Sequence, residues 1–82
     1  MKIIDDRRKQ SVESASLFLT PREAREMRSN LDDLLKDPEA HEHFHVYSDD
    51  NSREISCSII TEQKLKDLSK YNSLERQILA EE

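Results

Sequence analysis

Histidines alternate with other residues along one short stretch of the chain, at positions His41, His43 and His45. In a β-strand, alternate side chains point to the same face, so a strand here would align three imidazoles. Imidazole is a favoured zinc ligand, but His41 and His45 would lie roughly 13 Å apart along one flat strand. A metal site would therefore need His43, one neighbour and a ligand from elsewhere. We expect solvated or interface histidines instead, with no bound metal and no cofactor.

Nucleophilic chemistry has little support in the sequence. Cys57 is the only cysteine, and no cationic residue stands beside it to favour the thiolate. We expect Cys57 to point into the core from a strand. The chain has no glycine, so it lacks the residue on which phosphate-binding loops depend. The sequence therefore favours a protein that is not an enzyme.

Composition limits the class of protein further. The 82 residues are 38% charged and 34% hydrophobic, with a net charge of -5. This balance argues against nucleic acid as a partner, and no apolar run approaches the roughly 18 residues that would cross a membrane. One cysteine and no signal-peptide pattern favour the cytoplasm. A chain this short buries a small core, so we expect a homodimer or a protein partner.

A helix over residues 21–36 is the clearest element. Thr20 and Glu23 have the spacing of a capping box around Pro21, which suits the first helical position. Apolar residues then follow on one helical face, at positions 24, 27, 31, 34 and 35. Asp37 precedes Pro38, so the helix ends there.

Two alternating segments, 42–48 and 54–60, predict a β-hairpin. Pairing Val46 with Ile55 and Phe44 with Cys57 places apolar residues on one face and leaves the four-residue loop 49–52. A slip by one residue would bury the wrong face.

The remaining elements complete an α+β fold of order β-α-β-β-α. Ser16–Leu19 reads as a first strand, and residues 61–82 form one bent helix or two short ones, with Asn72 and Glu75 starting the last. We predict a three-stranded antiparallel or mixed sheet, of order 1-3-2, with the helices mainly on one face. Residues 1–14 are expected to be a flexible arm, and residues 15–82 a single domain.

The face of this sheet that the helices leave uncovered mixes aromatic and uncharged polar side chains, as protein interfaces do. The expected interface residues are Phe18, His43, His45, Tyr47, Ser56, Ser58 and Ile60.

Three functions fit these patterns. The first is a small cytoplasmic protein-interaction or assembly module that self-associates through the exposed sheet face. The second is a metal- or ligand-binding domain that uses His43 with His41 or His45. The third is a bacterial inhibitor of the immunity type. The capped Thr-Pro-x-Glu helix, between a short strand and a hairpin containing His-Phe-His, is similar to small bacterial accessory proteins such as toxin immunity proteins. The acidic loop residues Asp49 and Asp50, with the neighbouring Glu54, would bind a basic target.

Overall fold

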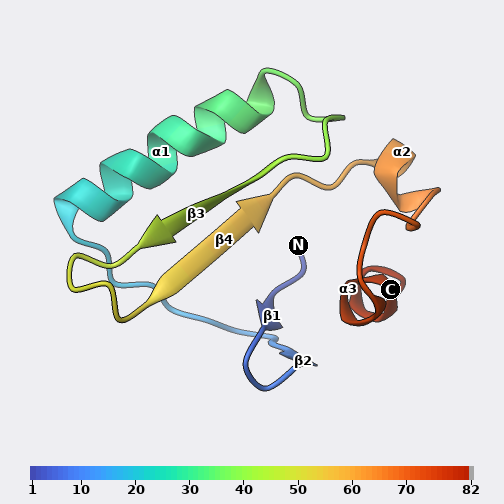
Figure 1. Cartoon of the computed structure of the whole chain (residues 1–82), viewed down its shortest axis with the longest axis horizontal. Coiled ribbons are helices and arrows are strands. Elements are labelled where there is room, and N and C mark those ends of the chain that lie inside the picture. The colour runs from blue at the N-terminus through green and yellow to red at the C-terminus, as the bar shows by residue number, and fades with distance from the viewer. Residues whose placement is uncertain (82) are drawn as a thin grey trace. The chain divides into compact units, whose positions relative to one another are not determined.

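The computed structural model describes residues 1–81 and divides into two compact units (Figure 1). Unit 1 combines Met1–Leu17 with the described residues from Glu62 onward, and unit 2 is the continuous segment Phe18–Thr61.

Strands pair only within each unit. Unit 1 contains β1 (Ile4–Asp5), β2 (Gln10–Ser11), α2 (Glu62–Leu65) and α3 (Ser73–Leu79), and unit 2 contains α1 (Pro21–Leu35), β3 (His43–Tyr47) and β4 (Glu54–Ser58). Over the described chain, β1 pairs with β2 and β3 pairs with β4, both antiparallel. The fold is mixed α and β, but the predicted three-stranded sheet of order 1-3-2 is wrong, because two separate two-stranded sheets take its place.

The error lies in the predicted first strand, Ser16–Leu19, which forms no strand. Phe18 is 95% exposed, and Leu17 and Leu19 are also exposed. Leucine is not β-branched and has little preference for a strand. The run also ends at once, because Thr20 already caps α1. The helices therefore do not share one sheet: α1 packs on β3, whereas α2 and α3 belong to unit 1.

The capping box at the start of α1 is confirmed. Thr20 Oγ1 accepts the Glu23 backbone N–H at 3.2 Å, and Glu23 Oε1 accepts the Thr20 N–H at 2.8 Å. Pro21 occupies the first helical position as predicted, and the helix ends at Leu35 with Lys36 as its cap, within one residue of the predicted end.

α1 lies along the hairpin on the side of β3 (Figure 1). Met27, Leu31 and Leu34 are half-buried on its inner face, whereas Leu35, expected in the core, is 60% exposed. Val46 of β3 is the buried apolar centre of unit 2, at 5% exposure.

The hairpin register is confirmed: Val46 pairs with Ile55, and Phe44 with Cys57. The Ser48 N–H donates to the Arg53 carbonyl at 3.0 Å and closes the predicted four-residue loop. Asn51 adopts φ 60° within that loop, in the left-handed region that asparagine tolerates better than most residues.

The first hairpin of unit 1 falls within the predicted arm. Its turn is closed by the Lys9 N–H, which donates to the Asp5 carbonyl at 2.8 Å, with Lys9 at φ 56°. The Lys2 ammonium donates to the Glu81 carbonyl at 2.6 Å. The flexibility of residues 1–14, and the single domain from residue 15, stay predictions.

The C-terminal segment forms two short helices, so the alternative of one bent helix is wrong. Asn72 and Glu75 make a second capping box at the start of α3, as predicted. Ile78 of α3 is buried. In the described part of the chain, no helix is both long and apolar enough to span a membrane.

Candidate interaction surface

The outer face of the β3–β4 hairpin gathers most of the predicted interface residues. The ladder places His43 opposite Ser58, His45 opposite Ser56 and Tyr47 opposite Glu54, and all six are exposed. The alternate residues on the other face, including Val46 and Phe44, are buried or half-buried. Strand alternation thus puts five of the seven predicted residues on one face.

Phe18 and Ile60, the other two predicted interface residues, lie outside the ladder. Phe18 stands two residues before the Thr20 cap of α1, and Ile60 follows the end of β4 by two residues. Phe18 is exposed and Ile60 half-buried.

Aromatic rings form a column along β3. The centroids of His43 and His45 are 4.9 Å apart in an edge-on arrangement, and those of His45 and Tyr47 are 6.2 Å apart in a stacked one. Glu54 joins two members of the column, because its carboxylate lies 3.2 Å from His45 Nδ1 and also accepts a hydrogen bond from Tyr47. That hydrogen bond raises the pKa of Tyr47.

The role of Glu54 was not predicted, although the predicted register already placed it opposite Tyr47. Cross-strand neighbours of this kind can be read from the register alone.

His41 lies before β3, which begins at His43. Within residues 1–81, no three His, Cys, Asp or Glu side chains are grouped so that they could hold a metal ion. The metal-binding hypothesis, which rested on His43 with His41 or His45, stays a prediction.

Cys57 lies on the inner side of β4 and is half-buried. Burial raises the pKa of its thiol, because desolvation disfavours the charged thiolate. This environment suits a packed side chain rather than a nucleophile.

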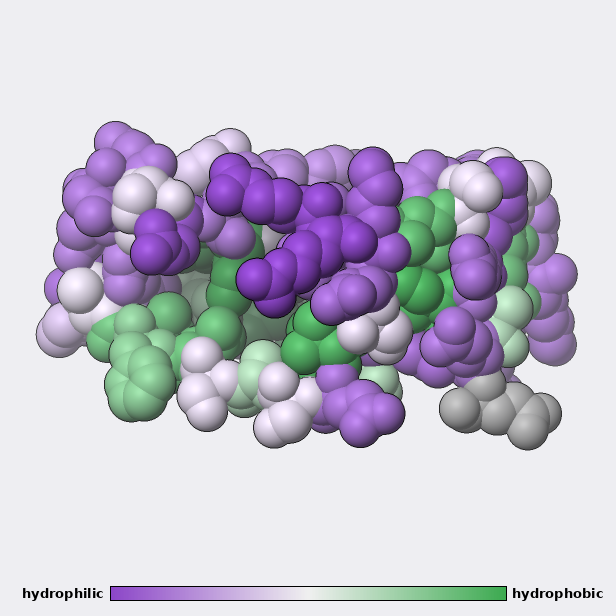
Figure 2. Space-filling view, turned by 90° about the horizontal axis from the view of Figure 1, so that it is seen from below, coloured by the Kyte–Doolittle hydropathy of each residue, from purple (hydrophilic) through white to green (hydrophobic). Residues whose placement is uncertain are grey.

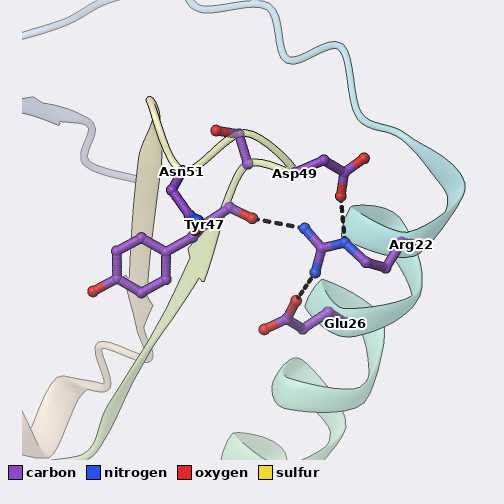
Figure 3. Close-up of a pocket in the computed structure, with 6 residues that line it drawn as sticks. Arg22, Glu26, Tyr47, Asp49 and Asn51 are labelled. Carbon is purple, nitrogen blue, oxygen red and sulfur yellow. Dashed lines mark hydrogen bonds and ion pairs between the residues drawn. The ribbon is translucent and has the colours of Figure 1, made fainter.

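The junction between α1 and the hairpin loop forms a shallow pocket of about 390 Å³ (Figure 3). The Arg22 guanidinium uses all three of its nitrogens there: Nε binds the Asp49 carboxylate, Nη1 donates to Glu26 at 2.6 Å, and Nη2 donates to the Tyr47 carbonyl at 2.8 Å. A guanidinium engaged in this way holds the two elements together and has little capacity left for an anionic ligand.

Glu23 makes a second link at the same junction. Its Oε1 completes the capping box, and its Oε2 accepts the Asp49 backbone N–H at 2.9 Å. The side chain is buried, at 7% exposure. The spacing of the capping box predicted the first bond, but the second joins residues 26 positions apart and leaves no local signal.

The acidic loop residues point toward partners within the chain. The hydrogen bond from Arg22 lowers the pKa of Asp49, with a further contribution from Thr20. Hydrogen bonds from Ser52 and Ser48 lower the pKa of Asp50. Both carboxylates therefore take part in contacts that stabilise the turn. The inhibitor hypothesis had assigned the same carboxylates to the binding of a basic target.

Within unit 2, the outer edge of β4 presents backbone groups that are not paired with another strand. The backbone hydrogen bond from the Ser48 N–H to the Arg53 carbonyl shows which cross-strand residue pairs of β3 and β4 are hydrogen-bonded. Because such pairs alternate along an antiparallel ladder, Ile55 and Cys57 bond to β3, and the N–H and C=O groups of Glu54, Ser56 and Ser58 point away from it. We call these outward groups the β4 edge.

No protein-family model matches the chain, and neither the curated proteins nor the solved structures contain a match to it. The geometry of the chain is therefore the basis for any functional proposal.

Proposed function

We propose that the chain is a small, non-enzymatic protein-interaction module that self-associates through unit 2. One observation carries this proposal. Within Phe18–Thr61, all of which is described, Val46 is the single buried apolar side chain, whereas Phe18, Leu19 and Leu35 are between 41% and 95% exposed. An element pair with so little buried apolar surface gains little of the hydrophobic free energy that stabilises a fold.

The size of unit 2 points the same way. It spans 44 residues, from 18 to 61 inclusive, close to the length of about 40 below which domains usually need a disulfide, a metal or a partner. A single cysteine allows no internal disulfide. Association with a second copy would bury apolar side chains that one copy leaves exposed.

The surface has a composition that suits this role. Tyr47 and the histidines of the column stand among serines on the outer face of the hairpin, and aromatic and uncharged polar residues are favoured at interfaces. Figure 2 shows hydrophobic side chains reaching the surface between hydrophilic ones. Phe18 and Ile60 remain part of the proposed interface.

The non-enzymatic part of the proposal draws on the same residues. Burial disfavours the thiolate of Cys57, and Arg22 is occupied by Asp49, Glu26 and the Tyr47 carbonyl. We place the protein in the cytoplasm, where a lone thiol stays reduced.

Sedimentation equilibrium on the full chain, from low to high micromolar concentration, tests the proposal. We expect a reversible dimer that Phe18→Ser weakens, because the substitution removes an exposed aromatic ring from unit 2. Leu65→Ser is the matched control, since it removes an exposed apolar side chain from unit 1. A chain that stays monomeric over the whole range would contradict self-association.

A further inference from the structure

The two edges of the β3–β4 hairpin differ. On the β3 side, α1 packs against the strand, and Arg22 binds the outward carbonyl of Tyr47. On the β4 side, the outward groups of Glu54, Ser56 and Ser58 have no such neighbour in unit 2. Figure 1 shows the same difference, with α1 beside β3 and not beside β4.

β4 also lacks the devices that protect edge strands from pairing. Exposed edges are usually blocked by lysine, proline, a bulge or an inward charge. The sequence from Glu54 to Ser58 contains no lysine and no proline, and its five residues pair with β3 without a bulge. Glu54 is its one charged residue, and that carboxylate is engaged by His45 and Tyr47. The strand is therefore suited to accept another strand.

We propose that β4 pairs antiparallel with β4 of a second copy, about a two-fold axis at Ser56, to form a four-stranded sheet. This inference rests on the proposed self-association and names its site. In the resulting order, β3–β4–β4–β3, the outward N–H and C=O groups of both copies would bond to each other.

The register follows from the ladder. Groups that point outward must meet outward groups, so Ser56 lies opposite Ser56 of the second copy and Glu54 opposite its Ser58. This is the one register in which all five residues of β4 are paired, and it opposes no two like charges. It also places Ile55 opposite Cys57 of the second copy, so apolar residues stay on the helix side. A slip by one residue would reverse the faces.

A second copy fits this edge because β4 is complementary to itself in this register. Glu54 meets an uncharged serine, and the half-buried Ile55 meets the half-buried Cys57 of the second copy. The same register brings the loop end of one hairpin, at Ser52, opposite Ile60 of the other.

Amide hydrogen exchange on the full chain, followed by NMR at low and high micromolar concentration, reads this pairing directly. We expect the amides of Glu54, Ser56 and Ser58 to become protected as concentration rises. Those of Ile55 and Cys57, which already bond to β3, serve as internal references at both concentrations.

Paired proline variants supply the second readout. Ser56→Pro removes an outward N–H and leaves the ladder to β3 intact, as proline on an edge strand can. Glu62→Pro is the control, because it removes an N–H outside β4, at the first position of α2, where proline is tolerated. We expect Ser56→Pro to weaken the dimer roughly tenfold or more, because two intermolecular hydrogen bonds are lost by symmetry. Glu62→Pro should leave the dimer in place, and circular dichroism should show both variants folded.

The outcomes separate the two proposals. A dimer that survives Ser56→Pro, with the three outward amides unprotected, overturns pairing through the β4 edge but leaves self-association standing. Loss of the dimer in Tyr47→Asp but not in Ser56→Pro would also overturn it and assign the contact to the outer face. A monomer at every concentration overturns both proposals.

Discussion

At the scale of single residues, Glu23 has the most consequential contacts. One carboxylate oxygen accepts the N–H that opens α1, and the other accepts the Asp49 N–H of the hairpin loop. The side chain is buried, and both hydrogen bonds are part-buried. Removing an acceptor leaves a partly desolvated donor unpaired, which costs more than the bond itself contributes.

Glu23→Gln should therefore destabilise the protein by about 1–3 kcal/mol, because glutamine keeps one acceptor oxygen and its amide nitrogen cannot accept the second N–H. Urea unfolding monitored by circular dichroism measures the change. Glu26→Gln is the matched control: it alters an exposed ion pair with Arg22 and should cost less than about 1 kcal/mol. Equal effects of the two substitutions would contradict the double role of Glu23.

Lys9 gives a second prediction for a single residue, in which the substitution stabilises the protein. It adopts φ 56° in the turn between β1 and β2, in a chain without glycine. A side chain in the left-handed region costs about 1–2 kcal/mol, and glycine avoids that cost but loses more entropy on folding. Lys9→Gly should thus stabilise the protein by roughly 0.5–1 kcal/mol. Thermal unfolding would show a raised Tm for Lys9→Gly and little change for Lys9→Ala; a lowered Tm for the glycine variant would refute the argument.

At the scale of elements, local signals in the sequence predicted α1, the hairpin and its register, and the start of α3. Each depends on residues close together in the chain: the Thr20 and Asn72 caps, or the alternation around Val46. The contacts of Arg22 with Asp49 and Tyr47 could not be predicted in this way, because they join residues at least 25 positions apart. The outer-face column was predicted because it follows from strand alternation alone.

The junction between α1 and the loop should weaken in acid. The pKa of Asp49 lies below its ordinary value of 3.8 because Arg22 binds the carboxylate, so the unfolded chain takes up that proton first. The stabilisation is complete well above the ordinary value and is lost as the pH falls through the lowered pKa. The Tm difference between wild type and Asp49→Asn should therefore be largest near neutral pH and shrink below about pH 4.

Arg22→Gln provides the control for this pH dependence. Without the guanidinium, Asp49→Asn should change Tm little at any pH, because the pair is already broken. A Tm difference between wild type and Asp49→Asn that stays constant down to the most acidic condition would show that the pair does not stabilise the junction.

At the scale of the whole molecule, the predicted sheet failed for a reason that lies outside any single element. The sequence contains enough apolar segments for three strands, but sheet formation depends on which segments meet. Leu17 and Leu19 were assigned to the core because of their type, yet both are exposed. Each unit has its own buried apolar side chain instead, Val46 in unit 2 and Ile78 in unit 1.

Truncating these two side chains should have local effects. Val46→Ala should cost on the order of 1–3 kcal/mol and speed amide exchange at Ile55 and Cys57, which bond to β3. Ile78→Ala should cost about 2–5 kcal/mol and speed exchange in α3. Exchange at Ile55 and Cys57 that is unchanged by Val46→Ala would show that Val46 is not the centre of unit 2.

The division into a continuous and a discontinuous unit has a consequence for the order of events during synthesis. All residues of unit 2 leave the ribosome before any residue from Glu62 onward, whereas unit 1 needs both its first and its last segments. At about 5–20 residues per second, the 20 residues from 62 to 81 take roughly 1–4 s to translate. A helix and a hairpin form in microseconds. Unit 2 can thus fold first as the chain emerges, because all its residues leave the ribosome before the segment that completes unit 1.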